Sequence, residues 1–371
     1  MSFNAIRLRI ARTFHGWNQR ELAEKVSVSH SAIAFYEKGL KSPKPEIRAA
    51  LAVVLKVDPS FFERPDLEDF REDESHFRRR IAATERQRKQ VLAHGSLFAE
   101  VARHLQREVR IVPRFALPEI TPTSLADVDR VADDVRRHVG LPLDVPIGSV
   151  ARILDNAGVL LLAVEMETAK RVDAFSRYGQ TSVVVLNTEK ESPSRTLFDE
   201  AHELGHGVMH RSGRTLTLDQ REDEANRFAG ALLLPREAFI RDMMGVRPDD
   251  WTYLFEMKRQ WGASIKAILY RAYQLGMLDA AEYRKRMRYY SYRGWNGGEP
   301  EEPQRDQPTL FSRVFAAYCE NTGTTASDIA VDLGWTEDLF TSVTGIPRAE
   351  AVAIGVIALD RYRGRGSARP A

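Results

Sequence analysis

The motif His202-Glu203-x-x-His206 has residue types and a spacing that can bind and use a metal ion. On a helix the two histidines are one turn apart, so both imidazoles leave the same face and can bind one zinc ion. Glu203 lies about 100° around the helix from His202, where its carboxylate can reach a water on the metal without taking a ligand position. The motif therefore predicts two zinc ligands and a general base.

The residues around the motif predict the helix that this chemistry needs. Pro193 precedes Ser194, which can cap a helix, and residues 195–209 contain no proline. An apolar stripe follows at helical spacing, formed by Leu197, Phe198, Ala201, Leu204 and Val208. An ordinary amphipathic helix with solvated histidines would show the same stripe, so a metal site requires a third ligand from elsewhere in the chain.

The third ligand is expected from a helix predicted over residues 218–234. The apolar stripe of this helix is formed by Ala225, Phe228, Ala229, Leu232 and Leu233. Glu222 lies about 60° from the centre of that stripe and Glu224 about 100° from it. This geometry favours Glu222 as the ligand and leaves Glu224 as an alternative, otherwise a supporting or surface carboxylate. Asn226, one turn after Glu222, can hydrogen-bond to a ligand.

His210 is another alternative for the third ligand. Metzincins use the motif H-E-x-x-H-x-x-G-x-x-H, in which a glycine turns the chain before the last histidine. Here His210 comes too early, and Met209 occupies the place of that glycine. We therefore expect a structural or substrate-facing role for His210.

Three β-rich runs, at residues 159–164, 172–176 and 182–186, precede the motif helix. A small sheet that leads into an H-E-x-x-H helix is the layout of zincin peptidases, in which an edge strand binds the substrate backbone by β-augmentation. The sequence therefore predicts an α+β fold that is mostly helical, with a zincin-like domain over residues 124–298.

Further residues fall in a fixed order around the motif. They are Asp173-Ala174-Phe175-Ser176, Val183–Asn187, Arg195, Phe198, residues 201–206, His210 and Glu222-x-x-Ala225-Asn226-x-Phe228-Ala229-x-x-Leu232-Leu233-Leu234-Pro235. Together they resemble the ImmA/IrrE family of metallopeptidases, soluble bacterial zinc enzymes that typically cleave a DNA-bound repressor. The resemblance covers about residues 125–298. It implies Zn²⁺ as the cofactor and a regulator protein as the substrate.

Residues 1–65 predict a head of five short helices, with Asn18 and Ser29 as caps of the second and third. Residues 18–23 and 28–39 resemble the lambda-repressor type of helix-turn-helix, often called Xre-like. The resemblance implies a recognition helix after Ser29 and a homodimer on a two-fold operator. The expected DNA contacts are Gln19, Ser29, His30, Ser31 and Lys41.

Charge supports DNA as the partner of this head. It contains eleven Lys and Arg against six Asp and Glu, a net charge of +5 that suits a phosphate backbone. Ala34 and Phe35 stand where relatives more often have polar residues, so few base-specific hydrogen bonds are expected. A head that binds protein or only dimerises is the alternative.

The remaining segments are predicted to be helical. Residues 66–123 form a connector with an acidic run at 66–74 and one or two helices over 76–110. Residues 299–308 form a polar, proline-rich linker. The tail to residue 371 predicts short helices at 310–322, 327–333, 335–343 and 348–358, which pack on the peptidase or dimerise, and a disordered end from residue 361.

Composition limits the class of protein. The chain has 371 residues, 43% hydrophobic and 29% charged, with a net charge of +2 that points to no polyanion overall. The single cysteine, Cys319, excludes an internal disulfide framework and suits a reducing compartment. There is no apolar leader at the N-terminus, and the longest aliphatic run, 159–164, is too short to span a bilayer. We expect a bacterial cytoplasmic protein, associated with the nucleoid when bound to DNA and without a membrane partner.

Two classes of function follow. The first is a DNA-binding zinc endopeptidase that cleaves a repressor or antitoxin-like regulator, with Glu203 as the catalytic base. The second is a non-catalytic regulator or antitoxin that uses the zincin-like domain as a sensor or a platform for a partner. A sensor has no need of Glu203, so the complete motif favours the peptidase.

Overall fold

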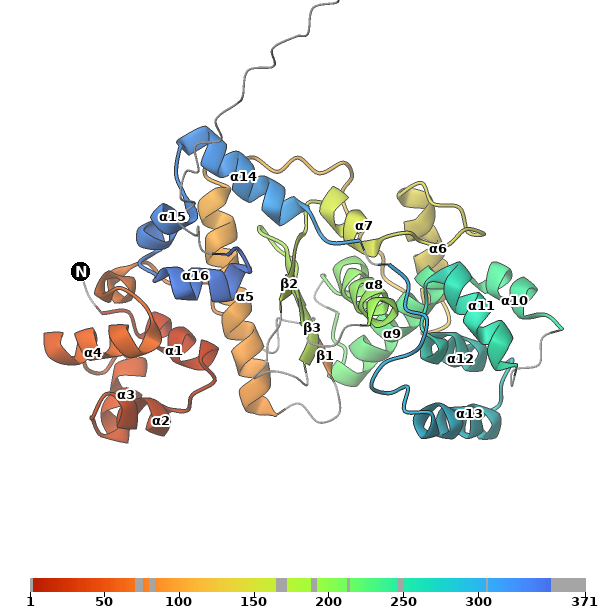
Figure 1. The fold of residues 1–371 in the computed structure, drawn as a ribbon, viewed down its shortest axis with the longest axis horizontal. Coiled ribbons are helices and arrows are strands. Elements are labelled where there is room, and N and C mark those ends of the chain that lie inside the picture. The colour runs from red at the N-terminus through yellow and green to blue at the C-terminus, as the bar shows by residue number, and fades with distance from the viewer. Residues whose placement is uncertain are drawn as a thin grey trace, which may run out of the picture.

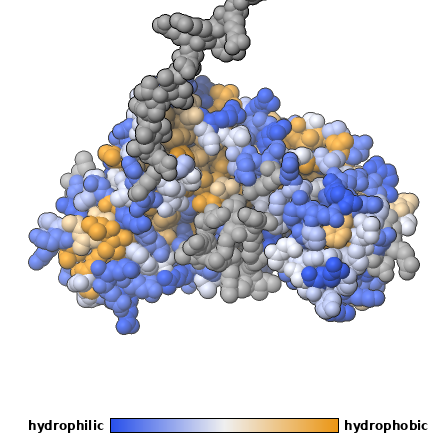
Figure 2. Space-filling model, in the orientation of Figure 1, coloured by the Kyte–Doolittle hydropathy of each residue, from blue (hydrophilic) through white to orange (hydrophobic). Residues whose placement is uncertain are grey.

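The computed structural model describes residues 3–70, 76–79, 84–164, 172–187, 192–211, 214–245, 250–304 and 306–347. Helices surround one small sheet (Figure 1), which confirms the predicted α+β, mostly helical fold. The face drawn in Figure 2 is largely hydrophilic, with hydrophobic side chains in separate patches. None of the described helices is long and apolar enough to cross a membrane.

The N-terminal head consists of α1 (Ala5–Phe14), α2 (Gln19–Lys25), α3 (His30–Glu37), α4 (Pro45–Leu55) and the 3-10 helix η1 (Pro59–Glu63). The side chains of Asn18 and Ser29 cap α2 and α3, as predicted, by accepting hydrogen bonds from backbone N–H groups. Leu22, Ile33 and Leu51 are fully buried and join the helices into one core.

The long helix α5 (Glu85–Leu105) lies between the head and the sheet (Figure 1). It is buried around most of its surface over its C-terminal two-thirds, because α1 packs on one side and the strands on the other. A Cβ on Gly95 would lie 2.4 Å from the Phe175 ring of the sheet, so a glycine is required for this close approach. The prediction of helix from residue 76 was wrong, because residues 76–79 form a strand, β1 (His76–Arg79).

The sheet has the strand order β1-β3-β4-β2, with β2 (Leu160–Val164), β3 (Val172–Arg177) and β4 (Val183–Asn187). The three predicted runs are therefore strands, and β1 is an addition to them. β2 and β4 are parallel, whereas β3 is antiparallel to both β4 and β1. Alternate residues of the strands belong to two different cores, one with α5 and one with the motif helix, as a sheet covered on both faces requires.

The second core is formed by helices on the other side of the sheet. They are α6 (Val128–His138), α7 (Val150–Asn156), α8 (Pro193–Met209), α9 (Leu218–Leu233), α10 (Arg236–Met243), α11 (Trp251–Trp261), α12 (Ile265–Gln274) and α13 (Ala280–Tyr292). Helix α8 carries the H-E-x-x-H motif and packs most extensively against α9. These two helices are those that the sequence predicted to carry the metal ligands.

The tail returns to the N-terminal half through α14 (Leu310–Thr322), α15 (Ala326–Leu333) and α16 (Glu337–Thr344) (Figure 1). Helix α14 packs on α5 and β2, and the Asp58 N–H donates to the Gly334 carbonyl at 2.9 Å. The tail was predicted to pack on the peptidase or to dimerise. In the structure it contacts the strand β2, and it also contacts α5 and the head. The predicted helix at 348–358 and the predicted disordered end lie outside the described residues.

Candidate metal centre

Helix α8 places its functional side chains in a fully enclosed position. His202, Glu203 and His206 each have 0% of their surface exposed, and α9 and the sheet cover the helix on two sides. Burial of two imidazoles and a carboxylate in one place is costly unless hydrogen bonds or a metal ion satisfy them. The burial of these side chains therefore favours a binding site over the alternative reading of the motif, an amphipathic helix with solvated histidines.

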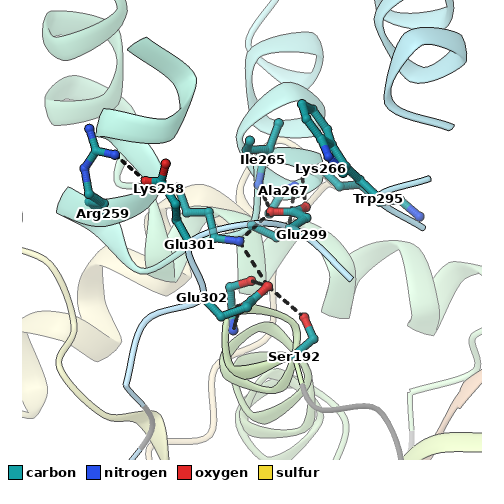
Figure 3. Close-up of polar contacts among 12 residues, drawn as sticks. Ser192, Lys258, Arg259, Ile265, Lys266, Ala267, Trp295, Glu299, Glu301 and Glu302 are labelled. Atoms are coloured by element: carbon teal, nitrogen blue, oxygen red, sulfur yellow. Dashed lines mark hydrogen bonds and ion pairs between the residues drawn. The ribbon is translucent and has the colours of Figure 1, made fainter. Parts of the chain in front are cut away.

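The N-terminus of α8 is capped by a distant segment (Figure 3). The Ser194 N–H donates to Glu302 at 2.8 Å, and the hydroxyls of Ser192 and Ser194 donate to the same carboxylate at 3.1 Å each. A carboxylate at this position stabilises the positive end of the helix dipole. The sequence predicted a polar, proline-rich linker at residues 299–308 and did not indicate that Glu302 of this segment caps α8.

A buried lysine holds this capping segment in place. Lys258 Nζ, which is fully buried, donates to Glu299 at 2.9 Å and to Glu302 at 3.0 Å (Figure 3). Glu299 in turn accepts the N–H of Ile265 at 2.8 Å and so caps α12. One ion cluster therefore joins the starts of α8 and α12 to α11.

Three side chains that can bind a metal converge between α8 and α9. His202 Nε2 and His206 Nε2 are 3.1 Å apart, and the two Glu222 oxygens lie one against each ring, Oε2 at 3.5 Å from His202 Nε2 and Oε1 at 3.3 Å from His206 Nε2. Ligands about 2.1 Å from a zinc ion at tetrahedral angles lie about 3.4 Å from one another. The distance between the two Nε2 atoms and the distance from each of them to its nearest Glu222 oxygen lie near that value, and two imidazoles with one carboxylate are a donor set that zinc accepts.

Electrostatics favour an ionised carboxylate at this position. Burial raises the pKa of Glu222, but hydrogen bonds and charge from His202 and His206 lower it by more, so its pKa lies well below the usual range. A carboxylate that stays ionised is ready to bind a cation without first losing a proton.

Neighbouring side chains fix the rotation of both rings. His202 Nδ1 lies 3.2 Å from Asn226 Oδ1, the contact expected of that asparagine. His206 Nδ1 lies 2.7 Å from His210 Nδ1, and His210 Nε2 lies 3.0 Å from Glu224. With the protons on His206 Nδ1 and His210 Nε2, every contact has one donor and one acceptor, and Nε2 of His206 is left with its lone pair.

Glu224 and His210 therefore orient the ring of His206 and do not belong to the group formed by His202, His206 and Glu222. Glu224 also accepts hydrogen bonds from Arg214, at 2.9 Å and 3.2 Å. Burial lowers the pKa of His210, although Glu224 opposes that shift, so the neutral ring is favoured. Of the alternatives left open by the sequence, Glu222 is the carboxylate that lies against both Nε2 atoms.

Two glycines of the motif region allow close packing that the sequence did not reveal. A Cβ on Gly205 would lie 2.8 Å from the Phe228 ring of α9, and one on Gly207 only 2.3 Å from the Tyr178 ring. The Tyr178 hydroxyl, whose pKa is raised well above its usual value by burial and by the Glu203 charge, donates to the Glu203 carbonyl at 2.7 Å. Tyr178 thus ties the end of β3 to the turn of α8 that carries the motif.

Four of the five predicted DNA contacts are exposed in the structure. They are Lys41, the α3 cap Ser29, and the first two residues of α3, His30 and Ser31. Gln19 is half-buried, and its amide donates to Glu37 at 2.7 Å. Glu37 also pairs with Arg12, so Gln19 is held in a network at the start of α2.

Comparison with known families agrees with this architecture. Residues 156–273 match the model of the IrrE N-terminal-like domain, and residues 8–62 match a helix-turn-helix model. No curated protein matches the chain. The fold and site define a DNA-binding regulator with a metallopeptidase-type domain. The chain joins an Xre-type helix-turn-helix to a domain of the ImmA/IrrE peptidase family, which confirms both resemblances.

Proposed function

We propose that this protein is a zinc endopeptidase that cleaves a regulator protein, of the repressor or antitoxin type, while its head binds operator DNA. The observation that carries the proposal is the convergence of His202, His206 and Glu222 beside the buried carboxylate of Glu203. Three protein ligands leave one position open, which is the arrangement of catalytic zinc and not of structural zinc.

Each residue has a distinct task in peptide hydrolysis. His202, His206 and Glu222 would hold the ion, and Asn226 with the His210–Glu224 pair would orient the two imidazoles. Zinc, when bound, supplies Lewis-acid polarisation of the peptide carbonyl and makes a water more acidic. Glu203 accepts a proton from the water that attacks the carbonyl carbon and donates it to the amide nitrogen as the C–N bond breaks.

The head would bring this chemistry to a promoter. The exposed start of α3 would enter the major groove, with Ser29, His30 and Ser31 nearest the bases and Lys41 near phosphate. Gln19, at the start of α2, would contact phosphate or bases from its network with Glu37. A homodimer would place two such helices on the halves of a two-fold operator.

One observation favours the second candidate, a non-catalytic regulator or antitoxin. His202, Glu203 and His206 have no exposed surface, and a peptidase needs access to its metal. A domain that only senses metal or binds a partner would tolerate such enclosure.

The deciding experiment compares new protein N-termini in cells that carry the native chain and cells that carry Glu203→Gln, before and after stress. We expect a cut in one regulator that depends on Glu203, with zinc bound equally by both proteins. Identical N-termini in every condition, with zinc bound, would refute the peptidase and support the second candidate.

A further inference from the structure

The two edges of the sheet have different neighbours, and the edge with β1 and β3 lies beside α8, the helix that carries the H-E-x-x-H motif. The β2 edge lies against α14, whereas α8 packs against β3, β4 and β1. Tyr178, which follows β3 directly, is bonded to the carbonyl of Glu203. An extended peptide that presents its carbonyl to the His202–His206–Glu222 group would therefore approach along the edge formed by β3.

Extended peptides bind sheet edges by adding a strand, because the edge offers a row of backbone donors and acceptors. On β3 that position is already taken by β1, which pairs with it in an antiparallel register from His76 opposite Ser176 to Arg79 opposite Val172. β1 is about a hundred residues away in sequence and belongs to the connector between the head and the peptidase. The chain itself thus provides the added strand.

Burial of the motif agrees with an occupied edge. His202, Glu203 and His206 have no exposed surface in a structure in which β1 lies beside α8. A separate polypeptide cannot pair with β3 while β1 does, since each edge binds one strand.

We propose that β1 occupies the place of the substrate strand on β3, so that this protein binds its protein substrate only after β1 has left the edge. The inference rests on the proposed peptidase function, and it identifies the segment that competes with the substrate. The occupant is a segment of the same chain, residues His76–Arg79, and the substrate segment that replaces it is extended and antiparallel to β3.

The segments on both sides of β1 in the chain are bonded to the DNA-binding head. Before β1, the Asp69 carboxylate pairs with Arg9 of α1 at 2.5 Å. After β1, Arg86 of α5 pairs with Glu21 of α2 at 3.0 Å. The described residues that flank β1 are therefore bonded to α1 and α2 of the head.

The pairing register of β1 and β3 identifies two positions at which a disulfide could fix β1 on β3. Ser176 is buried, its hydroxyl has no hydrogen-bond partner within the described part of the chain, and it lies opposite His76. The variant His76→Cys/Ser176→Cys, made with Cys319→Ser to remove the native thiol, would form a disulfide that fixes β1 on β3. Arg78→Pro is the opposite variant, because proline removes a backbone donor from the strand, and Arg78→Ala is its matched control.

The probe is a fluorescent tripeptide hydroxamate, which binds a metal and an edge together, and its affinity for the zinc-loaded full chain is measured by anisotropy. We expect oxidation of the cysteine pair to weaken binding at least about tenfold, reduction to restore it, and Arg78→Pro to strengthen it by about tenfold, since affinity scales with the fraction of open protein. The single-cysteine variants should not respond to oxidation.

Equal affinity in the oxidised, reduced and Arg78→Pro proteins would overturn the inference, as would failure of the disulfide to form. Hydrogen exchange of the β3 amides provides a readout that needs no zinc: it should rise in Arg78→Pro and not in Arg78→Ala. The proposed function is judged separately, by Glu203-dependent cleavage in cells, so its failure would not be mistaken for a failure of β1 to block the edge.

Discussion

Replacing Glu222 by glutamine is expected to weaken zinc binding far more than the same replacement at Glu224. Both residues lie on α9 only two positions apart, and both are largely buried. Glu222 lies within 3.5 Å of both Nε2 atoms, whereas Glu224 lies against His210 and Arg214. The pair therefore separates a ligand from a supporting carboxylate with the same chemical change.

The expected magnitudes follow from these positions. Loss of a side chain that only orients a ligand typically costs 10–100-fold in metal affinity, so loss of a ligand should cost at least about 100-fold, or about 2.7 kcal/mol. Glu224 acts through His210 on His206 and is one contact further away, so Glu224→Gln should cost less than about tenfold. Asn226→Ala, which removes the partner of His202 Nδ1, should fall between the two.

The measurement is a competition titration of the purified proteins with a chromophoric zinc chelator at neutral pH. Circular dichroism of each variant, taken before zinc is added, shows whether the fold survives the substitution. If Glu224→Gln lost zinc and Glu222→Gln retained it, the assignment of the third ligand from the geometry would be wrong.

Four further predictions concern the packing of α8, a buried ion cluster, a buried histidine of α5 and the head. Gly207→Ala should lower the free energy of unfolding by about 1–3 kcal/mol, because a methyl group would clash with the Tyr178 ring; an unchanged melting temperature would contradict this packing. Lys258→Met should cost about 3–5 kcal/mol, because it removes the cation from two enclosed carboxylates, Glu299 and Glu302, and urea titration measures the loss. Burial lowers the pKa of His94 to about 4, with a backbone carbonyl opposing the shift, so its share of stability is present above pH 6.5 and is lost, by about 3 kcal/mol, as the pH falls to 4. His94→Gln should flatten that part of the stability–pH curve, and an identical slope would assign the loss to other groups. Lys41→Ala should weaken binding to every DNA sequence alike and reduce the salt dependence by about one charge; a sequence-selective loss would place this lysine at a base.

The sequence predicted the elements of the site better than their surroundings. Two histidines at i and i+4 and a glutamate on the inner side of the next helix are local patterns, so helical geometry alone selected the three side chains that the structure brings together. Asn226 followed from the same reasoning, one turn after Glu222. These predictions needed only the direction of each side chain on its own helix.

The cap on α8 could not be predicted in that way. Glu299 and Glu302 stand in a stretch of prolines and charged residues, a composition typical of solvated linkers. Their burial depends on Lys258, more than forty residues earlier, and on two helix starts that need a carboxylate. The residues of the linker alone do not indicate these partners. Without Lys258 and the two helix starts, the charges of Glu299 and Glu302 would be expected to face solvent.

The strand β1 is a second element that local sequence patterns could not predict. Residues 76–79 are followed closely by a helix, and nothing local marks them as a strand. They become one because β3 offers an unpaired edge, and strand formation depends on such a neighbour more than on propensity. The least predictable element thus belongs to the connector and lies against β3 and α8. The proposed control of access rests on this pairing of β1 with β3, two segments that are distant in the chain.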